Sequence, residues 1–194
     1  ALEAEDATVR TRIATALGQI GDRRAVPALV AVVERGKAGD PVADAARASL
    51  RNILRGSQER VNTAVVEYQE LIKHYLHEDA DTVGYVFGEW QEVWHWEADK
   101  QQLTEKLVYE LVPNYLFYQR QAAELALTAL KLDTDNALLQ SLLAAALSRE
   151  LQLAQKYVAG GADAEMQDDA RTRAARLGKQ VPVVCHMLDA DVVG

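Results

Sequence analysis

The sequence predicts an all-α protein built from stacked antiparallel helical hairpins, with no β-sheet. Ala, Leu, Glu, Gln and Arg, which favour helices, are abundant in the 194-residue chain, whereas Pro and Gly number only 4 and 11. Apolar residues recur at helical spacing along most of the chain. Near the N-terminus this pattern repeats after 33 residues. A two-helix unit of that length buries its apolar face only by stacking on another unit.

The 33-residue period is visible when residues 9–20 are placed on residues 42–53. Four apolar positions then coincide: Val9 with Val42, Ile13 with Ala46, Leu17 with Leu50, and Ile20 with Ile53. A further helix is expected between the two copies, over residues 25–35, because Pro27 falls in its first turn, where a missing N–H costs nothing. The pair Gly21-Asp22 supplies the break before that helix.

Residues 16–29, ALGQIGDRRAVPAL, resemble the HEAT-repeat signature of the phycobilisome-lyase type. In that family an Ala-Leu-Gly-x-Ile-Gly-Asp run ends one helix, and Ala-Val-Pro-x-Leu begins the next. The second copy departs from the pattern, since Ala43 stands where Arg10 stands in the first. The resemblance covers residues 6–54 and implies a right-handed α-solenoid of HEAT-like hairpins. It implies no reaction, because most such repeats are binding scaffolds.

A second, weaker resemblance lies downstream. Residues 129–136 are similar to the hinge between tetratricopeptide repeats. A hairpin of two helices is therefore expected over residues 115–157, either as a tetratricopeptide-like unit or as a generic helix-turn-helix. Asp135 or Asn136 is a suitable N-cap for its second helix.

Composition divides the chain into four segments, residues 1–56, 57–112, 113–159 and 160–194. Residues 58–112 hold 12 Asp/Glu against 4 Lys/Arg and so account for the whole net charge of −8. Eleven of the 12 aromatic residues lie between Tyr68 and Tyr118. The segments are expected to be HEAT-like repeats, acidic aromatic-rich helices, the hairpin, and a linker with terminal helices that continue into a longer solenoid.

Charge and composition disfavour several classes of partner. The net charge of −8 opposes non-specific binding to nucleic acid and to anionic membranes. The longest apolar stretch, residues 137–147, is too short to span a bilayer. The single cysteine, Cys185, excludes a disulfide scaffold, and no glycine-rich phosphate loop is present. We expect a cytoplasmic protein with no cofactor and no small-molecule substrate.

One group of side chains has metal-ligand spacing. Glu70, His74 and His77 lie at i, i+4 and i+7 of an expected helix, a spacing that suits Zn²⁺. The competing interpretation is an ordinary solvated helix surface, and it is preferred because the spacing is common by chance. No metal site and no catalytic residue is assigned.

A candidate protein-binding surface lies on a helix expected around residues 83–97. The face opposite its apolar stripe carries Tyr85, Glu89, Glu92 and Trp96. The stripe itself is expected to face the core and consists of Val83, Val86, Phe87, Trp90, Val93 and Trp94. Carboxylates pair with Lys or Arg, and aromatic rings attract cations. This surface is predicted to contact a basic protein segment or a neighbouring part of the same longer chain. The alternative is that Tyr85 and Trp96 pack under a following helix, expected over residues 101–112.

The function that the sequence favours is a non-enzymatic scaffold or adaptor that binds another protein along a helical-repeat surface. Two alternatives follow from the HEAT resemblance. One is a phycobilisome-lyase-like module that handles a tetrapyrrole. The other is a HEAT-like DNA glycosylase, for which Arg47, Arg51 and Arg55 form a ridge suited to phosphates.

Overall fold

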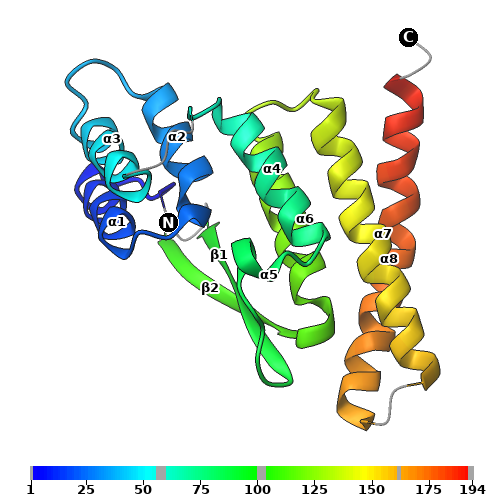
Figure 1. The fold of residues 1–194 in the computed structure, drawn as a ribbon. Coiled ribbons are helices and arrows are strands. Elements are labelled where there is room, and N and C mark those ends of the chain that lie inside the picture. The colour runs from blue at the N-terminus through cyan, green and yellow to red at the C-terminus, as the bar shows by residue number, and fades with distance from the viewer. Residues whose placement is uncertain (1, 56–59, 100–103, 161–162, 192–194) are drawn as a thin grey trace. The chain divides into compact units, whose positions relative to one another are not determined.

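The computed structural model describes residues 2–55, 60–99, 104–160 and 163–191, most of them helical (Figure 1). The α-helices are α1 (Ala7–Ile20), α2 (Val26–Arg35), α3 (Pro41–Ile53), α4 (Ala64–Leu76), α5 (Ala80–Val83), α6 (Phe117–Leu130), α7 (Ala137–Gly160) and α8 (Ala164–Asp191). Two 3-10 turns, η1 (Arg23–Ala25) and η2 (Asn114–Leu116), precede α2 and α6. In the described part of the chain, no helix is long and apolar enough to cross a membrane.

The prediction of a protein without a β-sheet is wrong. Strands β1 (Trp90–Asp99) and β2 (Thr104–Pro113) pair as a two-stranded antiparallel sheet, where helices were expected around residues 83–97 and over residues 101–112. Burial in β1 alternates, with Val93 at 1 % exposure and Trp94 at 49 %. The ring of Trp94 meets that of Tyr109 on β2, with centroids 4.9 Å apart. Such cross-strand aromatic pairs stabilise a sheet.

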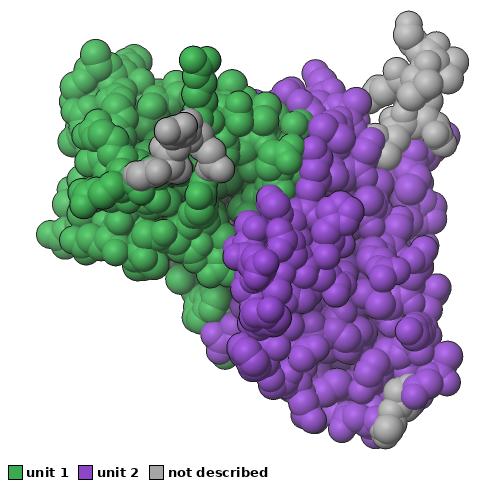
Figure 2. Space-filling view, viewed as in Figure 1, with its two compact units in different colours: residues 1–71, 94–110 green, residues 72–93, 111–194 purple. Residues whose placement is uncertain are grey.

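The chain divides into two compact units (Figure 2). Unit 1 comprises residues 1–71 and 94–110, and unit 2 comprises residues 72–93 and 111–194. The division falls within α4 and within both strands. The four segments suggested by composition, and a right-handed solenoid over the whole chain, stay predictions.

Unit 1 contains the helices of the expected repeat. Its core is formed by small and branched side chains of α1, η1, α2 and α3: Ala14, Ala25, Leu29, Val32, Val42 and Ala46. α1 approaches α3 closely at Gly18, where Ser49 of α3 donates a 2.8 Å hydrogen bond from its hydroxyl to the carbonyl oxygen of Ala14. The Asp6 side chain caps α1, and Gly21 ends it at φ +77°.

Unit 2 contains the downstream hairpin and a third long helix. α7 packs between α6 and α8, and α7 and α8 run antiparallel (Figure 1). The prediction of an N-cap at residue 135 or 136 is confirmed, since the Asn136 side chain accepts a 3.1 Å hydrogen bond from the N–H of Leu139. Fully buried alanines and leucines line the helices, including Leu116, Ala126, Leu139 and Ala154. These helices provide the framework on which the candidate site is built.

Candidate functional site

The loop between α5 and β1 exposes two aromatic rings. Tyr85 is 71 % exposed and Phe87 is 81 % exposed. Their ring centroids are 6.4 Å apart and the ring planes are tilted by 42°. Large apolar side chains that gather on a surface mark interaction sites. We call residues 84–89 the aromatic loop.

A glycine with positive φ stands on each side of the two rings. Gly84 has φ +83° and ψ 166°, and Gly88 has φ +83°. L side chains rarely adopt such backbone angles, and the conformation of Gly84 is nearly restricted to glycine. Both ends of this segment thus have backbone conformations that favour glycine, and Tyr85 and Phe87 occupy the part between the two glycines.

Side chains and backbone from η2 and α6 hold both ends of the aromatic loop. The Tyr118 hydroxyl donates a 2.8 Å hydrogen bond to the carbonyl oxygen of Gly84. The Asn114 side-chain amide donates one of 2.7 Å to the carbonyl oxygen of Gly88. The Asn114 backbone N–H donates a third, of 2.8 Å, to the carbonyl oxygen of Glu89. A loop fixed in this way loses less conformational entropy when a partner binds.

The surroundings of the aromatic loop are acidic. Residues 77–92 contain five Asp/Glu and no Lys/Arg. Glu78, Asp81, Glu89 and Glu92 are exposed. The fifth acid, Asp79, accepts hydrogen bonds from Thr82 and from His74, at 2.9 and 2.8 Å, and these bonds hold its pKa below the usual value. Acidic residues therefore lie on both sides of Tyr85 and Phe87 in the sequence.

Three of the predicted surface residues are exposed, but they lie in a loop and a strand and not on the expected helix. Tyr85 and Glu89 lie in the aromatic loop, and Glu92 lies in β1. Trp96 also belongs to β1, but its side chain lies outside the described residues. The alternative of packing under a helix over residues 101–112 is wrong, because residues 104–113 form β2.

Sequence reasoning missed Phe87. Its spacing from Val83 and Trp90 assigned it to the buried stripe of a helix, yet its ring is among the most exposed described. The two glycines around it were the available signal, because each glycine inside a helix costs about 1 kcal/mol relative to alanine. Two of them within five residues favour a loop.

The residues with metal-ligand spacing have other surroundings. Glu70 and His74 lie on α4, and His77 directly follows it. The Nδ1 atom of His74 lies 2.8 Å from a carboxylate oxygen of Asp79. Across the described residues, no group of three or more His, Cys, Asp or Glu side chains is placed to hold a metal ion.

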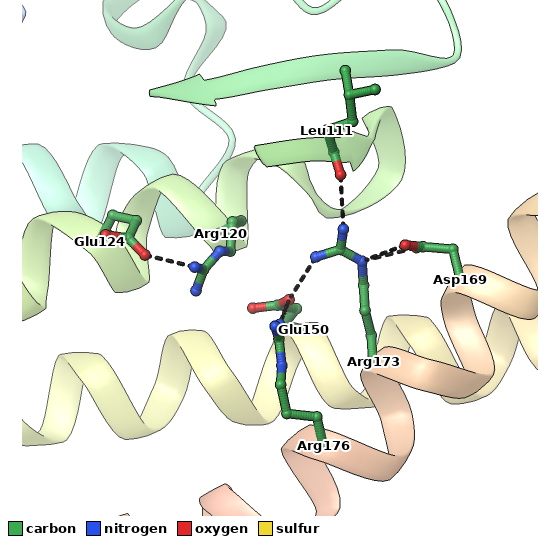
Figure 3. Close-up of polar contacts among 7 residues, drawn as sticks. All are labelled: Leu111, Arg120, Glu124, Glu150, Asp169, Arg173 and Arg176. Carbon is green, nitrogen blue, oxygen red and sulfur yellow. Dashed lines mark hydrogen bonds and ion pairs between the residues drawn. The ribbon is translucent and has the colours of Figure 1, made fainter. Parts of the chain in front are cut away.

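A buried charge cluster connects α7, α8 and the end of β2 within unit 2 (Figure 3). Arg173 of α8, 5 % exposed, donates from Nε to both carboxylate oxygens of Asp169, at 2.8 and 3.0 Å. Its Nη2 atom donates a 2.8 Å hydrogen bond to the carbonyl oxygen of Leu111. Glu150 of α7 is fully buried and lies 3.9 Å from guanidinium nitrogens of both Arg173 and Arg176. We call Glu150, Asp169, Arg173 and Arg176 the Arg173 cluster.

Tyr115 of η2 lies next to the Arg173 cluster. Its ring stacks on Tyr157 with centroids 4.5 Å apart. Burial, followed by the negative charge of Asp169, raises the pKa of Tyr115 to about 12. The phenol therefore stays neutral to a higher pH than an ordinary tyrosine does. Sequence reasoning did not anticipate this cluster, because its members come from two different helices, α7 and α8, and Arg173 also binds a carbonyl of the distant strand β2.

Comparison with known proteins gives a match in unit 1. Residues 9–35 match the family model described as PBS lyase HEAT-like repeat. Residues 9–35 form a HEAT-like repeat. The HEAT-like repeat comprises most of α1 together with η1 and α2, and the resemblance expected from the sequence is confirmed there. It does not include the aromatic loop. Neither a curated protein nor a solved structure matches the chain significantly.

Proposed function

We propose that the chain is a non-enzymatic helical-repeat module that binds a cationic segment of another protein through the aromatic loop. The observation that carries the proposal is the exposed Tyr85–Phe87 pair, 6.4 Å between centroids, within a stretch of five acids and no Lys/Arg. Tyr and other aromatic residues are enriched where binding energy concentrates at interfaces. The HEAT-like repeat agrees with a binding role, since such repeats act mainly as scaffolds.

The chemistry of the loop favours a partner rich in Arg or Lys. Exposed carboxylates at Glu89 and Glu92 attract cations and speed their approach. The faces of Tyr85 and Phe87 add cation–π attraction of about 0.5–2 kcal/mol for each well-placed guanidinium or ammonium group. The hydrogen bonds from Asn114 and Tyr118 prepare the loop for binding, so little of this energy is spent on ordering it.

Fluorescence anisotropy with the whole chain tests the proposal. The probe is a fluorescein-labelled peptide of alternating Arg and Gly, and an equally long peptide of alternating Glu and Gly serves as the negative probe. The double variant Tyr85→Ala, Phe87→Ala should weaken binding of the Arg peptide by about tenfold or more, as expected for hot-spot aromatics. The double variant should have nearly the same midpoint of urea unfolding as the unmodified chain, because both rings are exposed.

Ile20 offers a matched control, since it is an apolar residue with the same 71 % exposure as Tyr85 but lies on α1. Ile20→Ala should leave the affinity for the Arg peptide unchanged. Equal affinity of the double variant and the unmodified chain would contradict the proposed site. Equal binding of the Arg and Glu peptides would contradict the proposed class of partner.

The description of the matching family model contains the word lyase and supports one second candidate, a tetrapyrrole-handling module. The match covers a two-helix repeat, and repeats of this kind determine a fold without determining a reaction. Absorbance spectra separate the candidates. Mixing the chain with a bilin should leave the chromophore band unshifted if the chain is a protein-binding module, and a saturable shift would favour the tetrapyrrole-handling one.

A further inference from the structure

We propose that helix α8 controls the aromatic loop through Arg173, so that binding of a cationic partner depends on how α8 docks. Arg173 would then be a positioning residue for a site that it does not touch. This inference rests on the proposed function for its effect on binding. Its structural part, the control of the loop by Arg173, is measurable without any partner.

The first step is the attachment of Arg173 itself. The Asp169 carboxylate holds the Nε side of the guanidinium at 2.8 and 3.0 Å, and the buried Glu150 carboxylate lies 3.9 Å from Nη1 (Figure 3). Only 5 % of Arg173 is exposed. A planar guanidinium makes these contacts in fixed directions, which a lysine ammonium cannot reproduce. The remaining donor, Nη2, is thereby aimed at the carbonyl oxygen of Leu111.

The second step leads from Leu111 to the aromatic loop. The Leu111 side chain is 51 % exposed, so packing holds it weakly, whereas the 2.8 Å hydrogen bond from Arg173 holds its carbonyl. Asn114, which binds the loop, follows three residues later. Between them Val112 and Pro113 are buried, and Val112 packs in one cluster with Val93 and Leu116. Residues 111–116 therefore respond together when Leu111 moves.

The third step is the effect on binding. Asn114 supplies two of the three hydrogen bonds that join η2 and α6 to the aromatic loop, those to Gly88 and Glu89. If Leu111 is released, Asn114 samples more positions and the loop is ordered for a smaller fraction of the time. A partner that needs the ordered loop then binds more weakly in proportion to that fraction. Docking of α8 thus regulates the loop through residues 111–114.

Arg176 supplies a matched control for the experiment. Its guanidinium lies 3.9 Å from Glu150, as that of Arg173 does, and it stands one turn further along α8. It is 44 % exposed at its side chain, and among the described contacts it reaches Glu150 and not Leu111. Arg173→Lys and Arg176→Lys both preserve charge, so a changed attraction for a cationic probe cannot explain a difference between them.

The partner-independent test is amide hydrogen exchange of Asn114, followed by NMR in the whole chain. That N–H donates to the carbonyl oxygen of Glu89 and so reports directly on the loop attachment. Arg173→Lys should accelerate its exchange by about tenfold, as for local opening, while interior amides of α7 stay protected. Arg176→Lys should leave it unchanged. The inference would be overturned if the Asn114 amide in Arg173→Lys exchanged at the same rate as in the unmodified chain. It would also be overturned if the interior amides of α7 accelerated as much as the Asn114 amide.

The binding test uses the fluorescein-labelled peptide of alternating Arg and Gly. Arg173→Lys should weaken its binding by about fivefold, and Arg176→Lys by less than about twofold. The double variant Glu150→Gln, Arg173→Met removes the buried charges together, which proteins tolerate better than the loss of one, and it should also weaken binding. Similar affinities of Arg173→Lys and Arg176→Lys would overturn the inference. If the unmodified chain does not bind the peptide, the proposed function fails, and Asn114 exchange still decides the role of Arg173.

Discussion

The side-chain amide of Asn114 donates a 2.7 Å hydrogen bond to the carbonyl oxygen of Gly88, although 26 residues separate them in the sequence. The backbone N–H of Asn114 donates to the next carbonyl, that of Glu89. One residue of η2 therefore holds two successive peptide groups of the aromatic loop. This relationship explains how two exposed rings keep a defined position without being buried.

Replacing Asn114 by alanine should loosen the aromatic loop. The variant loses the side-chain hydrogen bond to Gly88, which is worth about 0.5–1.5 kcal/mol of unfolding free energy. Affinity for the Arg peptide should fall with it, because the loop must then be ordered upon binding. Urea denaturation and fluorescence anisotropy measure the two effects. Asn52→Ala, at an exposed position of α3, is the control. Equal affinities of Asn114→Ala and Asn52→Ala for the Arg peptide would argue against the attachment of the aromatic loop by Asn114.

Alanine at Gly84 should destabilise the protein. Its backbone, at φ +83° and ψ 166°, is unfavourable for any residue with a Cβ and should cost about 1–3 kcal/mol. Gly178 is a matched control, since it lies in the helix α8 and a Cβ added there would meet no neighbouring atom within 4 Å. Gly178→Ala should instead stabilise by about 0.5–1 kcal/mol. Thermal and urea unfolding followed by circular dichroism should give changes of opposite sign.

The close approach of α1 and α3 predicts that Gly18 does not tolerate a side chain. A Cβ at this position would lie 2.5 Å from the Cβ and 2.7 Å from the Cα of Ser49. Because a backbone atom is involved, the helices must move apart, and Gly18→Ala should cost about 1–3 kcal/mol. Gln19→Ala, at the exposed neighbouring position, serves as the control in the same urea titration. A variant as stable as the control would contradict this packing.

The core of the HEAT-like repeat predicts a ranking of stabilities. Leu29 is fully buried, and Leu29→Ala should cost about 2–5 kcal/mol of unfolding free energy. Leu17 is half-buried in the same cluster, so Leu17→Ala should lose less unfolding free energy than Leu29→Ala. Arg51 is exposed on α3, so Arg51→Ala should cost under about 0.5 kcal/mol. Chemical denaturation measures these losses. If Arg51→Ala lost more unfolding free energy than Leu29→Ala, the arrangement of the repeat would be contradicted.

Acid should remove one stabilising contact at the end of α4. Hydrogen bonds from Thr82 and His74 lower the pKa of Asp79 from 3.8, so the native state favours its ionised form. The contribution is present above pH 3.8, the unfolded value, and is lost as pH falls through the lower native pKa. Asp79→Asn should therefore be less stable than the unmodified chain near neutral pH, and the difference should shrink below pH 3.8. A stability difference between Asp79→Asn and the unmodified chain that stayed constant below pH 3.8 would contradict this role of Asp79.

The sequence by itself determined the HEAT-like repeat, because the signals involved act within a few residues. Gly21 ends α1 in the left-handed conformation at φ +77°. Asp22 caps the following turn by accepting a 2.9 Å hydrogen bond from the N–H of Arg24. Pro27 occupies the first turn of α2. Local propensity and capping decide such features before any tertiary contact forms. The same reasoning restricted the N-cap of α7 to residue 135 or 136, and the structure uses Asn136.

Tertiary structure decided that residues 90–99 and 104–113 form two paired strands. The apolar residues Trp90, Val93 and Trp94 are spaced as on one face of a helix, and their aromatic and β-branched side chains fit a strand equally well. Pairing with β2 and the contact of Trp94 with Tyr109 selected the strand. Local spacing holds no information about such a partner strand, so the prediction of two helices was wrong.

The candidate site shows the same division. The sequence identified Tyr85 and Glu89 as exposed surface residues, since each departs from the apolar stripe of its neighbours. It missed Phe87, and it contained no sign of the bond between Arg173 and Leu111, which are 62 residues apart. Every residue has a backbone carbonyl, so an acceptor of this kind has no signature in the amino-acid sequence. Only the packing of α8 against the end of β2 selects which carbonyl the buried guanidinium reaches.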